Sequence, residues 1–373
     1  MIQQSPGGGT GNTERKLMDE LIKAWDGECV IVSHDRPSGA WIFIAIHSTK
    51  LGPAIGGTRM KHYSELKDAL EDAQRLAAGM TYKWAAAGLR GGGGKAVIAL
   101  DHPLDQQERA SLLRRYGTLV RKHRGLFLTG PDLGTSSEDM DIIAQEAPSL
   151  VFGRTLEAGG GGNPAPFTAR GIFTALETTA QRLFGKGGLS GKKILVQGAG
   201  SVGRELIHLL QGCGCEVLFS DIEEETVRLH RNEKGLSFVP PEAVYETACD
   251  IFAPCAVGGV LNEESIPRLR CRAVVGGANN QLAAPEDARR LQDRGVLYAP
   301  DFVANSGGAI ALIGIETRGW SREEAMRRVV KAVRDNLEAI YRTADHEGIS
   351  TDEAARRLAQ RRIDEGAPEN EDS

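Results

Sequence analysis

The sequence predicts an α/β fold of two domains, the second built on a parallel, doubly wound sheet. Its 373 residues are enough for about two domains of ordinary size. In the second half, short apolar runs alternate with helical patterns, which favours a parallel sheet covered by helices. One of these runs, 193–197, leads into a glycine-rich turn and another helical pattern, as in doubly wound folds.

The composition is that of an ordinary globular chain and excludes several classes of protein. Charged residues make up 25% and hydrophobic residues 41%, which excludes a wholly disordered chain. A net charge of −5 without basic runs predicts no nucleic-acid partner. No window approaches the ~18 apolar residues of a membrane span, and no secretory signal is found. We therefore expect a cytoplasmic protein with six reduced cysteines, no membrane partner and no metal site.

The first half shows the patterns of short strands and two amphipathic helices. Apolar residues at helical spacing predict a helix over 64–78, with one face directed at a core. A second helix is expected over 108–124. Apolar runs predict strands at 29–33, 41–46, 95–100 and 126–128.

A break lies at 159–166, where four glycines and two prolines interrupt any helix or central strand. We therefore predict a first domain over 14–160 and a second over 164–324. The C-terminal helical region, about 325–365, is expected to pack back onto the first domain. Composition predicts disorder at both ends, over 1–13 and 366–373.

Strands and helices are expected to alternate after this break. The predicted strands are 193–197, 216–220, 250–253, 273–276 and 295–299. The predicted helices are 169–183, 202–211, 322–347 and 352–365. Because parallel strands need crossover helices, this order indicates a doubly wound sheet.

The strongest local signal is a glycine motif between a predicted strand and a predicted helix, Gly198-Ala-Gly200-Ser201-Val202-Gly203. Gly198 is expected to make the tight turn, Gly200 to leave room for a pyrophosphate, and Gly203 to let helix and strand pack closely. Asp221 ends the next strand, where a carboxylate binds ribose hydroxyls. No Arg or Lys follows at 222–225, so the motif predicts a Rossmann-type domain that binds NAD rather than NADP.

Further polar residues follow the later strands, where the ligand crevice of an open α/β sheet lies. Amide side chains and accessible backbone there suit a polar nicotinamide ring. The residues singled out for cofactor binding are Ala253, Cys255, Asn279 and Asn305. Each of the two asparagines, taken alone, is equally compatible with an ordinary turn.

Two lysines and one aspartate in the first half are candidates for catalysis. Lys83 and Lys95 flank glycine-rich stretches, where burial and a second ammonium lower a lysine pKa toward the ~7–8 useful in acid–base chemistry. Lys83 could instead stay charged and bind a carboxylate, and surface lysines beside a loop would show the same pattern. Asp132 directly follows a predicted strand, where turn and N-cap residues also occur.

Together these segments resemble the Glu/Leu/Phe/Val amino acid dehydrogenase family, most closely its leucine and phenylalanine members. The resemblance spans about residues 30–365. It implies NAD-dependent, reversible oxidative deamination of an L-amino acid to a 2-oxo acid and ammonium, two domains around a cleft, and a homo-oligomer, dimer or octamer, assembled through the first domain. The segments that match are 51–60, 75–83, 88–95, 132–143, 191–203, 249–259, 278–282 and 298–308.

The resemblance also implies roles for individual residues. Lys83 matches the lysine that binds the substrate α-carboxylate, and Asn280 matches the asparagine that orients the substrate. Lys95 matches the catalytic lysine that activates water, and Asp132 matches the aspartate that carries protons to and from the amino nitrogen. Hydrolysis of an iminium needs such a base poised near neutral pH.

The substrate side chain is expected to be apolar. Ile55 precedes Gly56 and Gly57, where glutamate-specific members have a lysine, and an aliphatic group cannot compensate a buried carboxylate. The family pattern is altered around the expected pocket, at Gly130, Phe152 and Ala309, and Leu312 follows Ala309 by one helical turn. A leucine-type substrate is favoured; an aromatic amino acid, or an inactive protein that only binds NAD, remains the alternative.

Overall fold

The computed structural model describes residues 19–23, 25–231 and 233–366, which form two compact units. Unit 1 contains the described residues up to Thr81 together with Gly91–Val151. Unit 2 contains Tyr82–Arg90 and the described residues from Phe152 onward. Apart from Gly366, the terminal segments for which disorder is expected lie outside the described residues.

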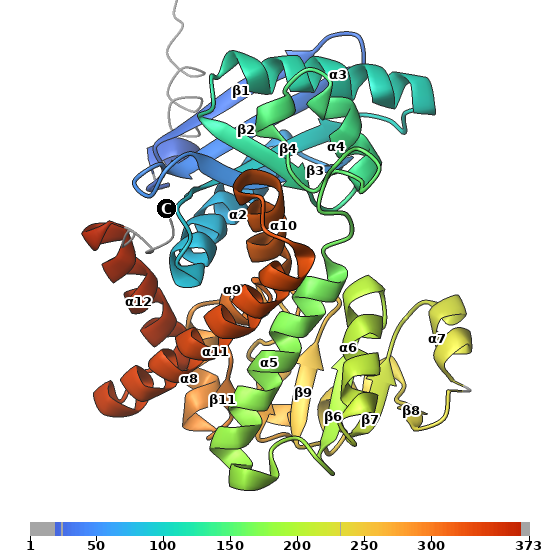
Figure 1. Cartoon of the computed structure of the whole chain (residues 1–373), viewed down its shortest axis with the longest axis vertical. Coiled ribbons are helices and arrows are strands. Elements are labelled where there is room, and N and C mark those ends of the chain that lie inside the picture. Colours follow the sequence, from blue (N-terminus) through green and yellow to red (C-terminus); the bar gives the residue numbers. More distant parts are fainter. Residues whose placement is uncertain (1–18, 24, 232, 367–373) are drawn as a thin grey trace, which may run out of the picture. The chain divides into compact units, whose positions relative to one another are not determined.

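Unit 1 is built on a mixed five-stranded sheet (Figure 1). In spatial order its strands are β1 (Cys29–Asp35), β2 (Ala40–Ser48), β4 (Gly92–Leu100), β3 (Ala54–His62) and β5 (Phe127–Pro131). β2 pairs antiparallel with β1 and β4, whereas β3 lies parallel between β4 and β5. The apolar runs predicted β1, β2, β4 and β5, but two glycines hid β3.

Helices bury both faces of this sheet because alternate side chains of β2 are apolar on both sides. Ile42 and Ile44 share a core with α3, whereas Phe43 and Ala45 share one with α2. α2 continues past Gly79, where the sequence pattern indicated an end, because its buried face outweighs the low helix propensity of glycine. The helical segments are η1 (Asp19–Lys23), α2 (Leu66–Ala87), α3 (Gln106–Lys122), α4 (Ser137–Ala144) and η2 (Pro148–Leu150).

Unit 2 contains the doubly wound sheet that the sequence predicts. Its six strands are all parallel and lie in the order β11 (Leu297–Tyr298), β10 (Ala273–Val274), β9 (Ile251–Pro254), β6 (Lys193–Gln197), β7 (Glu216–Ser220) and β8 (Leu236–Phe238). Two runs of strands therefore diverge from β6, so the strand order reverses beside it. In such sheets the ligand crevice lies at the carboxyl ends of the strands next to this reversal.

Helices cover this sheet and extend beyond it (Figure 1). α5 packs on α6, α10 and α11, and α11 packs on α12. Gly348, in the left-handed conformation, ends α11, and Ser350 caps α12 by accepting the Glu353 N–H. The helices are α5 (Ala165–Phe184), α6 (Ser201–Gly212), α7 (Glu224–His230), α8 (Glu286–Asp293), α9 (Asp301–Ala304), α10 (Gly307–Arg318), α11 (Arg322–Glu347) and α12 (Thr351–Glu365), with short turns η3 (Gly185–Gly187), η4 (Pro241–Glu246) and η5 (Ile266–Arg268).

The C-terminal helices complete the end of α2. The last turn of α2 carries no basic residue, so its final carbonyls need hydrogen-bond donors from elsewhere in the chain. Arg362 of α12 donates to Ala85 O at 3.1 Å and to Ala86 O at 2.6 Å. Asn336 of α11 also donates to Ala86 O, and its own oxygen accepts from Arg362 at 2.8 Å. These contacts group α11 and α12 with Tyr82–Arg90 in unit 2, and the expected packing of 325–365 on the first domain stays a prediction.

Replacing Arg362 by Met is expected to lower the free energy of unfolding by about 1–3 kcal/mol, because three hydrogen bonds from the guanidinium, to Ala85 O, Ala86 O and Asn336 Oδ1, are lost. Urea denaturation followed by circular dichroism measures the change. Arg361→Met is the matched control, since Arg361 is exposed and one residue away. Equal stability of the two variants would show that the carbonyls find other partners.

Candidate active site

A buried ion pair lies at the centre of unit 1. Lys95 projects from β4 with a side chain only 6% exposed, and its Nζ lies 3.1 Å from Oδ1 of Asp132. Asp132 directly follows β5, where its backbone closes a tight turn by hydrogen bonds with Thr135. Asp132 is therefore both the turn residue that its position after a strand suggested and a member of the ion pair. The structure brings together the two residues predicted to be catalytic.

Glycines on β3 make this approach possible. A Cβ on Gly56 would lie 1.8 Å from the Gly94 carbonyl oxygen, and one on Gly57 would lie 2.9 Å from the Asp132 Cβ. Both distances exclude a side chain. Gly57 also pairs with Gly130 of β5, so β3, which lies between the strands that carry Lys95 and Asp132, meets β5 across bare backbone.

The charges in this pair adjust each other's proton affinity. Burial is the main cause of the lowered pKa of Lys95; the Asp132 carboxylate opposes this shift and the Arg59 guanidinium adds to it. Burial by itself would raise the pKa of Asp132, but Lys95 and Arg59 lower it to about 2. Asp132 therefore stays ionised near neutral pH, while Lys95 gives up its proton more readily than an exposed lysine.

Arg59 is a member of the site that the sequence reasoning missed. Its Nε donates to Asp132 Oδ2 at 2.9 Å and its Nη1 donates to Asp72 Oδ2 at 2.8 Å. Tyr63 holds the same Asp72 oxygen at 2.7 Å. The second cation acting on Lys95 within unit 1 is thus Arg59, whereas the sequence reasoning had assigned that effect to another lysine. The sequence could have revealed Arg59, because it follows Gly57 by two residues and residues i and i+2 of a strand lie on the same face.

Lys83, expected in the first domain, belongs to unit 2 and contacts an asparagine predicted to bind the cofactor. Its Nζ donates to Asn279 Oδ1 at 3.4 Å, and this oxygen also accepts from Asn305 Nδ2 at 2.8 Å. Asn280 has a left-handed backbone with φ of 52°, a conformation that Asn tolerates and that is frequent at functional sites. An ammonium beside this amide cluster suits the recognition of a carboxylate.

The glycine motif has the geometry expected of it. Gly198 has φ of 96°, and a Cβ on Gly203 would lie 1.9 Å from Gly198 O. A Cβ on Gly200 would meet nothing within 4 Å, which leaves open space at the N-terminus of α6. Ser201 and Val202 begin this helix, whose N-cap makes no side-chain hydrogen bond. The first N–H groups of α6 therefore remain available to a phosphate.

Asp221 follows β7 beside the glycine motif. Its Oδ2 accepts the Ala199 N–H at 2.7 Å, and its Oδ1 accepts the Glu223 N–H at 2.9 Å. The same carboxylate lines a cavity of about 620 Å³ with Arg228 and Arg231, two cations that the sequence reasoning did not consider. A carboxylate that is fixed by backbone and open to a cavity suits hydroxyl recognition.

Unpartnered amide oxygens mark the carboxyl end of the sheet. Oδ1 of Asn305 and Oε1 of Gln197, at the end of β6, are buried without a hydrogen-bond partner. Each such acceptor costs free energy unless a ligand or water donates to it. A carboxamide such as that of nicotinamide supplies N–H donors of this kind. Together with the open N-terminus of α6, these atoms fit a nicotinamide dinucleotide.

The two other predicted cofactor residues are buried around β9. Ala253 lies within β9 and is fully buried. Cys255 follows this strand, and burial raises the pKa of its thiol to about 12. Its backbone N–H donates to Gln197 O at 2.7 Å. Cys255 is therefore an unreactive thiol that shapes the turn.

Each residue expected to contact the substrate side chain has a defined place within its own unit. In unit 1, Ile55 is 4% exposed on β3, and Gly130 is buried on β5. In unit 2, Phe152 and Leu312 are buried, and Ala309 lies three residues before Leu312 on α10. Spacing of three places both on one face of the helix.

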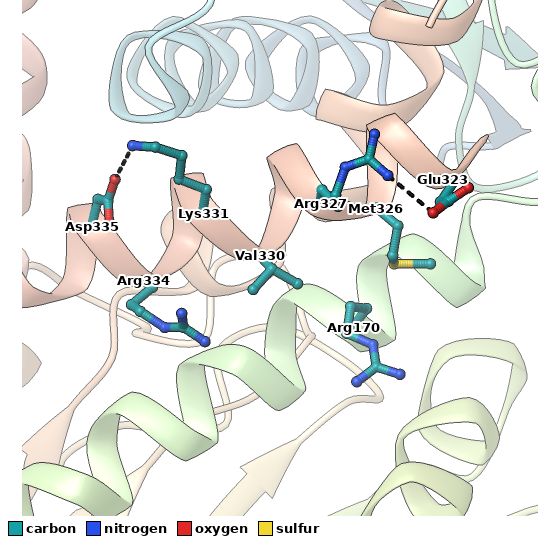
Figure 2. Close-up of a pocket in the computed structure, with 8 residues that line it drawn as sticks. All are labelled: Arg170, Glu323, Met326, Arg327, Val330, Lys331, Arg334 and Asp335. Carbon is teal, nitrogen blue, oxygen red and sulfur yellow. Dashed lines mark hydrogen bonds and ion pairs between the residues drawn. The ribbon is translucent and has the colours of Figure 1, made fainter. Parts of the chain in front are cut away.

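Another hollow of the described structure lies away from all of these residues. A groove of about 460 Å³ lies on α5 and α11. Figure 2 shows its lining, with Arg170 and Arg334 on either side of Val330. None of the predicted site residues lines this groove. In the described part of the chain, no group of three or more His, Cys, Asp or Glu is placed to hold a metal. Nor does any described helix combine the length and apolarity that a membrane span requires.

The parallel sheet with its glycine turn at α6 is a dinucleotide-binding fold, and the family comparisons place the chain among the oxidoreductases that act on CH–NH₂ groups. Residues 34–149 match the dimerisation domain of the Glu/Leu/Phe/Val dehydrogenases, and residues 219–369 match the Glutamate/Leucine/Phenylalanine/Valine dehydrogenase domain. The chain belongs to this family of amino acid dehydrogenases.

Named relatives and a solved structure agree with this assignment. Leucine dehydrogenase of Geobacillus stearothermophilus is 42% identical, over 92% of this chain and 93% of its own length. Phenylalanine dehydrogenase of Lysinibacillus sphaericus is 40% identical, over 93% of this chain and 91% of its own. The structure of L-tryptophan dehydrogenase from Nostoc punctiforme is similar with a TM-score of 0.76 and 37% identity, covering 93% of this chain and 98% of that one.

Lys95→Ala is expected to lower kcat by about 10²–10⁴-fold, because the family resemblance implies that Lys95 is the base that activates the attacking water. The fold should persist, since Arg59 still pairs with Asp132. Initial rates of NADH formation and a thermal melt measure the two effects. Wild-type activity in a folded variant would contradict the role of Lys95.

Arg59→Gln is expected to shift the acidic limb of the pH profile of kcat/KM to higher pH. Removing the guanidinium raises the pKa of Lys95, because Arg59 contributes to lowering it. Lys95 then becomes neutral, and so competent as a base, only at higher pH. Arg59→Lys, which keeps the charge, should shift the limb less. A shift toward lower pH would overturn this account of the electrostatics.

Proposed function

We propose that the chain catalyses the reversible, NAD-dependent oxidative deamination of a branched aliphatic L-amino acid of the leucine type. The observation that carries this proposal is Ile55, an almost fully buried aliphatic side chain directly before Gly56 on β3. A distal carboxylate placed against it would lose hydration without gaining a partner, at a cost of several kcal/mol. Five leucine dehydrogenases that are 39–42% identical to this chain support the same substrate class.

The residues of the site divide the work of this reaction. Lys83 binds the substrate α-carboxylate through its ammonium, and Asn280 orients the substrate beside it. The ionised Asp132 takes one proton from the substrate ammonium before the amine is oxidised to the iminium. Neutral Lys95 then takes a proton from the water that attacks the iminium carbon, which gives a carbinolamine. Asp132 returns its proton to the amino nitrogen, the C–N bond breaks to release ammonia, and the hydroxyl proton goes to solvent as the 2-oxo acid forms. The bound nicotinamide ring supplies the chemistry of hydride acceptance from Cα.

The dinucleotide would be held by unit 2. The N-terminus of α6 at Gly200 and Ser201 would bind the pyrophosphate, and Asp221 would bind ribose hydroxyls. Asn305 would hold the carboxamide through its unpartnered oxygen. The Asp221 carboxylate favours NAD, whereas Arg228 in the same cavity offers the charge that a 2′-phosphate would require. We therefore propose NAD as the cofactor. The Asp221 carboxylate lies beside the glycine turn, where it would repel a 2′-phosphate.

An aromatic amino acid is the second candidate substrate. Gly130 and Ala309 are small, which would leave room for a ring on the walls that they form. The relatives named phenylalanine and tryptophan dehydrogenase support this possibility. Phe152 acts in the opposite direction, because its large buried side chain fills space.

We further propose a homo-oligomer, dimer or octamer, assembled through unit 1. The match of residues 34–149 to a dimerisation domain supports this, as does β1, an edge strand with Val32 half exposed. A reducing compartment such as the cytoplasm suits the six cysteines, all of which are free thiols. Light scattering distinguishes a dimer from an octamer.

With NAD, the rate of NADH formation is expected to be highest for leucine and its branched relatives, lower for phenylalanine and tryptophan, and negligible for glutamate. NADP should support little turnover with the same substrates. A panel of L-amino acids, repeated in reverse with 2-oxo acids and ammonium, measures this ranking. Aromatic substrates ahead of leucine would favour the second candidate, and NADH binding without any turnover would favour an inactive binding protein.

A further inference from the structure

Glu316 on α10 is a buried carboxylate to which the reaction assigns no step. Its side chain is only 2% exposed. Oε1 accepts the backbone N–H of Gly153 at 2.6 Å and that of Gly161 at 2.9 Å, and Oε2 accepts from Arg154 Nε at 3.4 Å. A buried carboxylate is retained only when donors compensate its lost hydration, and here all three donors come from one loop.

This loop, residues 153–162, is folded tightly on itself and is held from two helices. Arg154 donates onward to Ala158 O at 3.1 Å, and the Gly162 N–H donates back to Arg154 O at 3.0 Å. Arg322, at the start of α11, donates to Gly161 O at 2.7 Å. Both backbone groups of Gly161 are therefore held: Glu316 accepts from its N–H, and Arg322 donates to its carbonyl.

The anchored loop lies against a residue of the expected substrate pocket. A Cβ on Gly161 would lie 2.5 Å from Leu312 Cδ2, so the bare backbone of the loop packs directly on the Leu312 side chain. Leu312 precedes Glu316 by four residues on α10, which places both on one face of the helix. The loop also begins directly after Phe152, so holding the Gly153 N–H fixes the backbone next to that ring.

We propose that Glu316 is a positioning residue for substrate specificity, which clamps loop 153–162 against Leu312 and so sets the size of the side-chain pocket. This inference rests on the proposed function. Without the clamp, the loop withdraws and Leu312 gains rotamers. The pocket then loses its fit to a branched aliphatic side chain and tolerates a larger aromatic one.

Three variants test this with the full-length enzyme. Glu316→Ala removes every acceptor, Glu316→Asp keeps the charge but is one methylene too short, and Glu316→Gln keeps one oxygen for Gly153 and Gly161. The ratio of kcat/KM for leucine to that for phenylalanine is expected to fall about 10–20-fold in Glu316→Ala, at the lower end of the range for one methylene of fit. Glu316→Asp should fall similarly and Glu316→Gln less, while KM for NAD stays unchanged.

Glu338→Ala is the matched control, because Glu338 is an exposed carboxylate on α11 whose ion pair with Arg342 is 3.9 Å long. It should leave the ratio unchanged. A lower melting temperature of Glu316→Asp with an unchanged substrate ratio would overturn the inference, since Glu316 would then act on stability alone. If Glu316→Ala fails to fold, Glu316→Asp decides by itself. Absence of leucine and phenylalanine turnover in the wild type would overturn the proposed function and this inference together.

Discussion

The close approach of β3 to its neighbouring strands is the constraint on which the catalytic unit depends. Only glycine fits at Gly56 and Gly57, because the Gly94 carbonyl and Asp132 occupy the space of a side chain. This approach places Lys95 and Asp132 at 3.1 Å in a buried position. Burial then destabilises the ammonium, and the pKa of Lys95 falls as acid–base chemistry requires. Geometry, burial and proton affinity thus follow from one feature of the backbone.

Arg59 resolves the electrostatic difficulty that this arrangement creates. A single carboxylate beside Lys95 would hold the lysine protonated, which would defeat its use as a base. By sharing Asp132, the guanidinium lowers the pKa of Lys95 and keeps Asp132 ionised. Asp72 in turn compensates the charge of Arg59. The buried network therefore keeps two opposite charges in contact and leaves the lysine able to lose its proton.

Pattern and spacing were sufficient where chemistry depends on local sequence. The glycine turn and the parallel sheet around it lie where the motifs predicted. Lys95 and Asp132 were singled out separately, and their contact is a finding of the structure. Arg59 escaped notice because β3 was not recognised as a strand: Gly56 and Gly57 suppress the apolar signal of the segment. Glu316 escaped because its partners are backbone N–H groups over 150 residues away, which no periodicity reveals.

The cap on α2 has a consequence for the order in which the chain becomes functional during synthesis. Arg362 follows the Ala85 carbonyl that it binds by 277 residues. At about 5–20 residues per second, the ribosome delivers it roughly 15–55 s after the end of α2 has been made. Until then, the carbonyls of Ala85 and Ala86 lack their hydrogen bonds from Arg362. A nascent or C-terminally truncated chain can therefore assemble the sheet of unit 1 while Lys83, for which we propose carboxylate binding, still lies near a helix end without its cap.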